Sequence, residues 1–175
     1  MHKKDNQIHK IIRVDHAGEL GAKWIYEGQL RWMRDPETKN IIQHMYDQEI
    51  AHLAYFEGLI QQRRVRPTVL MPLWKWVGRT AGAVSAMMGA KAAMACTEAV
   101  EDVIDQHYAD QIKVLESSFP EESDLIQKIK QFREDECNHR DTAAEYNQHP
   151  SPTRKLVKKA LKLGVLAAIK VSKRF

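Results

Sequence analysis

The chain has 175 residues, of which 43% are hydrophobic, and its 27 basic and 23 acidic residues give a formal net charge of +4. This length and apolar content suit one compact domain with a sizeable core and exclude a disordered chain. Two cysteines without a Cys-x-x-Cys pair exclude a disulfide framework and favour a reducing compartment. The N-terminal residues lack the apolar stretch of a secretory signal, so we expect no such signal.

Helix-forming residues dominate the sequence, and no stretch shows the sustained alternation of a β-strand, so we predict an all-α chain. The four long helices are predicted at residues 6–34, 38–62, 90–117 and 121–147. Asp35-Pro36-Glu37 separates the first two, because it combines a helix stop with an N-cap residue and a proline at the first helical position. Pro120 lies between the last two helices.

Each half of the chain contains a single glutamate followed by a Glu-x-x-His motif. Residues three apart on a helix share a face, so each motif directs one carboxylate and one imidazole to the same point. One Glu from each of two helices, with a Glu-x-x-His from each of two others, is the ligand set of a carboxylate-bridged dinuclear iron or manganese centre in a four-helix bundle. The predicted metal ligands are Glu19, Glu49, His52, Glu101, Glu136 and His139.

Residues 65–89 form a long crossover between the two helix pairs, as a ferritin-like topology requires. The crossover is apolar and contains Trp74 and Trp76, but its longest uncharged stretch, residues 80–90, has only 11 residues. Such a stretch is too short to cross a bilayer. Two interpretations stay open: a helix packed across the bundle, and an interfacial segment with tryptophans at the level of the lipid headgroups.

The C-terminal residues 154–175 hold eight of the 27 basic residues and none of the 23 acidic ones, so the rest of the chain is net acidic. At helical spacing, lysines gather on one arc and leucines and valines on the remainder, which predicts a basic amphipathic helix over residues 152–175. Three roles stay open for this helix: contact with an anionic membrane, binding of an acidic partner, and capping of the bundle by its apolar face. No aromatic stacking residues or base-reading motif support a nucleic-acid partner.

Together these elements predict an all-α, ferritin-like four-helix bundle with an apolar crossover helix and a C-terminal basic amphipathic helix. We expect residues 1–175 to form a single ferritin-like domain, in which the bundle occupies residues 6–147.

Five segments of the chain resemble the demethoxyubiquinone hydroxylase family: residues 11–19 (IIRVDHAGE), 47–52 (DQEIAH), 64–74 (RVRPTVLMPLW), 93–97 (AMACT) and 132–136 (FREDE). The resemblance extends from about residue 11 to the C-terminus. It implies a membrane-associated di-iron monooxygenase of the 3-demethoxyubiquinol 3-hydroxylase type, which hydroxylates the ring of demethoxyubiquinone or its quinol with O₂ in ubiquinone biosynthesis. All six ligand positions of the family are filled here. His107 and Tyr108 match the family's His-Tyr pair and are implied as carriers of electrons or protons.

The same resemblance implies two iron ions, ferrous in the reduced state, with NADH as the ultimate reductant. The sequence has no Gly-x-Gly-x-x-Gly loop, so we predict no cofactor-binding residues for a dinucleotide. The implied partners are a polyprenyl quinone substrate and the membrane surface, and a lipid-binding accessory protein and a homo-oligomer stay open. The expected location is peripheral, at the cytoplasmic face of a bacterial inner membrane, with the matrix side of the mitochondrial inner membrane as the alternative.

Two other classes of protein fit parts of the pattern. A ferritin- or rubrerythrin-like iron oxidase or peroxide scavenger uses the same ligands, but does not need an amphipathic face for a membrane. If the protein is instead a non-catalytic helical bundle, the six ligand positions form a chance pattern, and replacement of Glu49 or His52 leaves the metal content unchanged.

Overall fold

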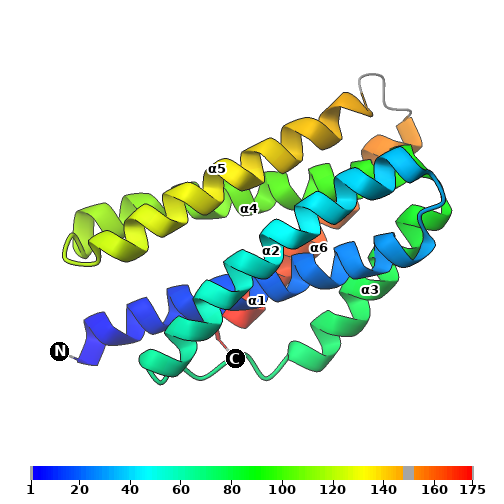
Figure 1. Ribbon diagram of the computed structural model, residues 1–175. Coiled ribbons are helices and arrows are strands. Elements are labelled where there is room, and N and C mark those ends of the chain that lie inside the picture. Colours follow the sequence, from blue (N-terminus) through cyan, green and yellow to red (C-terminus); the bar gives the residue numbers. More distant parts are fainter. Residues whose placement is uncertain (1, 148–151, 175) are drawn as a thin grey trace. The chain divides into compact units, whose positions relative to one another are not determined.

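The computed structural model describes residues 2–147 and 152–174 (Figure 1). Within these residues all regular secondary structure is helical, which confirms the predicted all-α class. The helices are α1 (His2–Trp32), α2 (Pro36–Gln62), α3 (Met71–Met87), α4 (Ala90–Ser118), α5 (Ser123–Glu145) and α6 (Pro152–Ser172). The pair α1 and α2 is followed by the crossover helix α3, the pair α4 and α5, and then α6. This is the element order of a ferritin-like chain. Phe175, the last residue of the predicted C-terminal helix, lies outside the described residues.

Both ends of α2 have a local explanation. Asp35 is the N-cap, its side chain accepts a hydrogen bond from the Thr38 backbone N–H at 2.8 Å, and Pro36 starts the helix, as predicted. At the other end, Arg64 has a φ of 51°. The backbone N–H of Arg64 donates to Gln61, and that of Val65 donates to Ile60. This is the Schellman pattern that ends a helix through one left-handed residue.

The described residues divide into two compact units. Unit 1 contains α1, α2, α3, the first residues of α4 up to Ala93, and the part of α6 from Gly164. Its apolar cluster joins α1 and α2 through Leu20, Trp24 and Leu53, and Met71 and Trp74 of α3 pack against it. Unit 2 contains the rest of α4, α5 and the part of α6 up to Leu163. The single domain expected from the sequence stays a prediction.

In unit 1, α1 and α3 approach each other so closely that glycine is required at the contact. A Cβ atom added to Gly82 would lie 2.0 Å from the carbonyl oxygen of Ile25, and one added to Gly28 would lie 2.4 Å from that of Arg79. At the same contact, Arg79 Nε donates to Glu27 Oε2 at 2.8 Å. Although burial by itself raises the pKa of Glu27, hydrogen bonds from Arg79 and Lys23 hold this pKa below its ordinary value. Glycine contacts and an ion pair therefore join α3 to α1.

In unit 2, α4 and α5 run side by side (Figure 1). Leu115 of α4 and Leu125 and Ile129 of α5 are fully buried. Ion pairs join the two helices at two levels: Glu116 Oε1 lies 2.5 Å from Lys130 Nζ, and Arg133 Nε donates to Asp105 at 2.7 Å. These contacts fix α4 and α5 as one antiparallel pair.

The crossover is a helix that combines features of both interpretations of its sequence. Trp74 packs into the core of unit 1, as expected of a packed helix. Trp76, two residues later, is 75% exposed, and further apolar side chains of α3 and its flanks are exposed beside it. These are Val69, Leu73, Val77, Val84, Met87 and Met88. Among the described residues, no helix combines the length and hydropathy needed to cross a membrane.

The two parts of the C-terminal helix α6 each make polar contacts within their own unit. In unit 2, Lys158 pairs with Glu98 and Lys162 pairs with Asp102, both on α4. In unit 1, Trp74 Nε1 donates to Ser172 Oγ at 3.2 Å. Meanwhile Leu156, Leu163 and Leu166 are exposed. Two lysines of α6 are therefore paired with acidic side chains of α4, in the same chain. Three leucines of α6 are exposed.

Candidate metal centre

Three of the predicted ligands meet in unit 1. Glu19 comes from α1, and Glu49 and His52 come from successive turns of α2. Each of these residues offers one ligand atom, and the three ligand atoms all lie within 4.8 Å of one another. His52 Nδ1 lies 3.6 Å from Glu19 Oε2, and all three residues are at most 3% exposed. We call these residues triad 1.

The other three predicted ligands meet in unit 2 with the same composition. Glu101 comes from α4, and Glu136 and His139 come from α5. Their ligand atoms also lie within 4.8 Å of one another, and His139 Nδ1 lies 3.4 Å from Glu136 Oε2. All three residues are at most 2% exposed. We call these residues triad 2.

The donor set of each triad suits a divalent metal ion. Each triad offers two carboxylates and one imidazole, which are ligands for iron, manganese and zinc. With ionised carboxylates and a neutral imidazole, each triad carries a charge of −2, which one divalent ion balances. Buried carboxylates are costly unless charge or hydrogen bonds compensate them, so three converging ligand side chains in a core are an arrangement that metal binding explains.

Glu98 lies three residues before Glu101, so sequence spacing alone also allows Glu98 as the α4 ligand. The structure separates the two glutamates: Glu101 is 1% exposed within triad 2, whereas Glu98 forms an ion pair with Lys158 of α6. Helix position alone leaves this choice open, because residues three apart share a face.

His107 and Tyr108 lie on α4 about two turns beyond Glu101. Tyr108 is 1% exposed, and the ring centroids of the two residues are 6.4 Å apart. Gln111 Nε2 lies 3.0 Å from His107 Nε2. Because an amide N–H can only donate, His107 Nε2 accepts in this arrangement. A residue seven positions after Glu101 returns to the same side of the helix, so Tyr108 is the member of the pair that shares the face of Glu101.

Two buried or partly buried groups near the triads were not singled out from the sequence. His16 of α1 is 4% exposed; burial lowers its pKa, and the charges of Glu57 and Glu19 oppose this shift. The signal for His16 was its position three residues before Glu19. Asp105 of α4 lies one turn after Glu101 and binds two arginines of α5. No sequence pattern predicts that contact, because it joins two helices.

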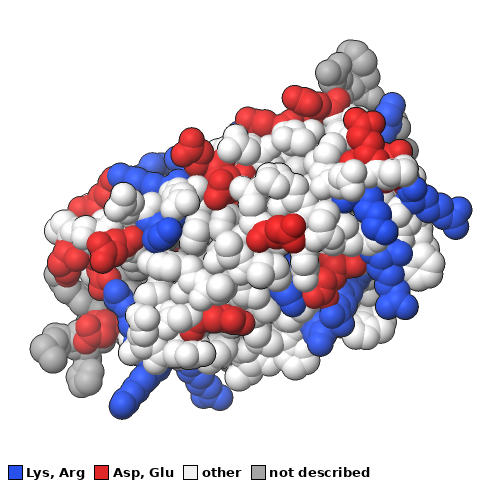
Figure 2. Space-filling view, in the orientation of Figure 1, with Lys and Arg blue, Asp and Glu red and all other residues white. Residues whose placement is uncertain are grey.

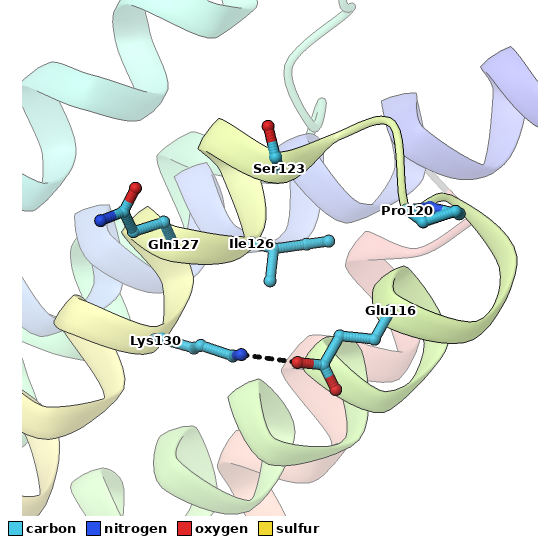
Figure 3. A pocket seen from close by; sticks show the side chains of 6 residues that line it. All are labelled: Glu116, Pro120, Ser123, Ile126, Gln127 and Lys130. Atoms are coloured by element: carbon cyan, nitrogen blue, oxygen red, sulfur yellow. Dashed lines mark ion pairs between the residues drawn. The ribbon is translucent and has the colours of Figure 1, made fainter.

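An open hollow on unit 2 lies away from both triads in sequence. Its lining residues come from the end of α4 and the start of α5: Glu116, Pro120, Ser123, Ile126, Gln127 and Lys130. The ion pair between Lys130 and Glu116 lies at its edge (Figure 3). Five of its six lining residues are exposed, so this hollow is too open to enclose an apolar quinone ring.

A helical chain whose two helix pairs each bury two glutamates and one histidine at ligand distance has the donor chemistry of a ferritin-like metalloprotein. Residues 6–172 match the family model of the ubiquinone biosynthesis protein COQ7, and the chain belongs to this family. The resemblance seen in the five sequence segments is thereby confirmed.

Curated relatives from distant organisms support the same membership. A mouse protein, named NADPH-dependent 3-demethoxyubiquinone 3-hydroxylase, mitochondrial, is 46% identical over 96% of this chain and 78% of its own length. A Rhodospirillum rubrum protein, named 3-demethoxyubiquinol 3-hydroxylase, is 43% identical over 95% of this chain and 78% of its own length. A yeast protein, named 5-demethoxyubiquinone hydroxylase, mitochondrial, is 44% identical over 81% of this chain and 67% of its own length.

Proposed function

We propose that this chain is a metal-dependent monooxygenase that hydroxylates the ring of demethoxyubiquinone, or its quinol, in ubiquinone biosynthesis. The observation that carries the proposal is the pair of buried triads, each made of one Glu and one Glu-x-x-His, in a chain of the COQ7 family. The names of the relatives supply the reaction, and the triads supply the kind of metal site that such a reaction needs.

The two triads are proposed to act as the two halves of one di-iron centre. Their combined donor set, four glutamates and two histidines, is that of ferritin-like dinuclear carboxylate proteins. Two ferrous ions balance the charge of the four carboxylates. When bound, such an iron pair supplies the electrons and the open coordination positions that O₂ activation requires. The protein's own contribution is to hold the six ligand side chains in its interior, each at most 3% exposed.

His107 and Tyr108 are proposed to carry electrons or protons during the reaction. Tyr108 is buried on the same side of α4 as Glu101, so its hydroxyl lies in an environment from which bulk water is excluded. His107 is only partly buried, and the contact with Gln111 Nε2 orients its ring. A partly exposed imidazole next to a buried phenol is a suitable entry point for protons.

The electrons are proposed to come from a nicotinamide nucleotide. The family resemblance pointed to NADH, whereas the mouse relative's name specifies NADPH. The sequence has no Gly-x-Gly-x-x-Gly loop, which disfavours a tight Rossmann-type site for either nucleotide. Hydroxylation rates measured in parallel with NADH and with NADPH test which of them supplies the electrons.

Peripheral contact with a membrane is proposed to bring the polyprenyl quinone to the protein. The exposed apolar side chains of α3 and the exposed leucines of α6 suit insertion among lipid chains, and exposed Lys159, Lys170 and Lys173 suit anionic headgroups. By contrast, acidic side chains follow α5 (Figure 2), among them the exposed Asp124, Glu134 and Asp141. The α5 surface is therefore not proposed as the membrane contact. A lipid-binding accessory protein and a homo-oligomer stay predictions.

The location proposed for the chain is a membrane surface of the compartment where ubiquinone is made. The relatives' names place some of them in mitochondria, and another relative is bacterial. Both the cytoplasmic face of a bacterial inner membrane and the matrix side of the mitochondrial inner membrane agree with these names.

The membrane proposal predicts that the double variant Trp76→Gln, Leu163→Gln binds anionic vesicles at least about tenfold more weakly than the parent, because each buried apolar side chain contributes roughly 1.5–3 kcal/mol. Sedimentation with vesicles of mixed zwitterionic and anionic lipid measures the binding. Trp32→Gln is the matched control, because Trp32 is exposed at the end of α1 and outside both helices. Equal binding by the double variant and the parent would contradict a role for α3 and α6.

The hydroxylase proposal is tested with protein loaded anaerobically with Fe(II) in lipid nanodiscs. Demethoxyubiquinone, NADPH or NADH, and ¹⁸O₂ are added, and mass spectrometry follows the quinone. We expect product that carries one labelled oxygen, loss of that product in Glu49→Ala, and unchanged product in the control Glu145→Gln, whose side chain is exposed near the end of α5. Oxygen consumption without labelled quinone would favour the iron oxidase or peroxide scavenger instead.

A further inference from the structure

One carboxylate on α4, that of Asp105, binds donors from successive turns of α5. Arg133 Nε donates to Asp105 Oδ1 at 2.7 Å, and Arg140 Nη1 donates to Asp105 Oδ2. The Cys137 side chain also hydrogen-bonds to Asp105. Arg140 in addition donates through Nε to Asp141 at 2.9 Å. Two arginines and two aspartates thus form a compact ion cluster without net charge.

The residues of this cluster lie within one turn of the ligands of triad 2 along α4 and α5. Asp105 lies one turn after Glu101 on α4, while Arg133 and Arg140 lie three residues before and four residues after Glu136 on α5. Side chains three or four positions apart on a helix are neighbours, with Cβ atoms about 5–6 Å apart. Each guanidinium is therefore within reach of the turn that holds a ligand carboxylate.

A guanidinium that is not held elsewhere is a strong competitor for such a carboxylate. Its planar fork binds both carboxylate oxygens at once, and the side chain stays charged at every relevant pH. A carboxylate engaged in this way has fewer lone pairs to offer and its charge is already balanced, so it binds a metal ion more weakly. The side chain of Asp105 is only 15% exposed and holds both arginines at the same time, one on each of its oxygens.

We propose that Asp105 is a positioning residue for triad 2: it holds Arg133 and Arg140 away from Glu101 and Glu136, and so keeps those carboxylates available to a metal ion. This inference rests on the proposed metal centre, and it adds to it the residue that protects one half of the ligand set. In this role Asp105 acts only through the two arginines.

A simple structural role makes a different prediction. Arg133 is 41% exposed on its side chain, and ion pairs with such exposure add little to stability. If Asp105 only joined α4 to α5, its loss would resemble the loss of the other ion pair between these helices, Glu116 with Lys130. That pair lies away from the triad and gives a matched control.

The test measures the affinity of the full-length chain for Fe(II) by anaerobic titration, with the bound ions counted by elemental analysis. In Asp105→Asn, Arg133 loses its anionic partner and Arg140 keeps only the exposed Asp141. We expect a rise in the metal Kd of about 10- to 100-fold, the range found when groups that support metal ligands are removed. In the triple variant Asp105→Asn, Arg133→Gln, Arg140→Gln, the competing cations are gone. We expect its Kd to return close to that of the parent, although more contacts between α4 and α5 have been removed.

The control Glu116→Gln, Lys130→Gln should keep the Kd of the parent, and so should Arg133→Gln, Arg140→Gln with Asp105 intact. A triple variant that binds metal as weakly as Asp105→Asn would overturn the proposal, because loss of packing and not competition would then explain the effect. An unchanged Kd in Asp105→Asn would overturn it as well. A parent protein that takes up no Fe(II) would instead refute the proposed metal centre, which is a separate result.

Discussion

Glu49→Gln in triad 1 and Glu136→Gln in triad 2 are each expected to abolish binding of both metal ions. In a dinuclear centre the carboxylates bridge or balance both ions, so loss of one carboxylate weakens both sites. We expect each Kd to rise by more than about 100-fold, beyond the range seen for groups that only support the ligands. Anaerobic Fe(II) titration with elemental analysis gives the number of ions bound per chain, and Glu145→Gln serves as the control.

The stoichiometry separates a joint centre from two independent sites. If triad 1 and triad 2 bind metal separately, each variant loses one ion and keeps the other with the Kd of the parent. That outcome would contradict the di-iron centre while leaving two metal sites in place. Retention of both ions in both variants would contradict the metal assignment itself and support a non-catalytic bundle.

Although the same variants weaken metal binding, we do not expect them to lower the stability of the metal-free protein. Glu49 is fully buried near Glu19, and Glu136 is fully buried near Glu101, so each replacement removes a negative charge from a buried acidic cluster. We expect the metal-free variants to unfold at the same or a higher temperature than the metal-free parent. The parent should gain about 2.7 kcal/mol for each ion bound when free Fe(II) reaches 100 times the Kd, and the variants should gain far less.

Gly82→Ala is expected to destabilise the protein, because α1 and α3 leave no room for a Cβ atom at this position. The added Cβ would lie 2.0 Å from the carbonyl oxygen of Ile25 and 3.1 Å from the backbone nitrogen of Gln29, so α1 and α3 would have to separate. Overpacking of this kind costs about 1–3 kcal/mol or more, which exceeds the gain in helix propensity from alanine. Urea unfolding followed by circular dichroism measures the change.

Gly58→Ala is the matched control for this prediction. Gly58 lies inside α2, and a Cβ atom there would have no neighbour within 4 Å. The replacement should therefore stabilise the protein by roughly 0.5–1 kcal/mol through the lower conformational entropy of the unfolded chain. Similar stability of Gly82→Ala and Gly58→Ala would show that α1 and α3 tolerate a wider separation than their observed contact.

Much of the candidate site could be predicted from the sequence because its pattern is local. A Glu-x-x-His motif needs only helical geometry to bring its two side chains together, and this holds for Glu49 with His52 and for Glu136 with His139. Glu19 and Glu101 were predictable from their order along the chain. The choice of Glu101 over Glu98 was not decided by spacing, since it depends on Lys158, which lies on another helix.

The helices were predictable for the same reason. Asp35 and Pro36 define the start of α2 through contacts within four residues, and the predicted ends of the long helices differ from the observed ones by at most four residues. The αL residue at the end of α2 was less predictable, because Arg64 takes the position where glycine is usual.

The sequence by itself determined that this chain is helical, that it belongs with the COQ7 proteins, and that Glu49 with His52 and Glu136 with His139 share a helix face, because periodicity and motif spacing are properties of single helices. Only the tertiary structure decided that Gly82 meets Ile25, that Lys158 and Lys162 pair with α4, and that Asp105 holds two arginines of α5. Such contacts depend on the rotation and axial register of one helix against another. Those two quantities are set by packing of the whole unit, and no local pattern of residues encodes them.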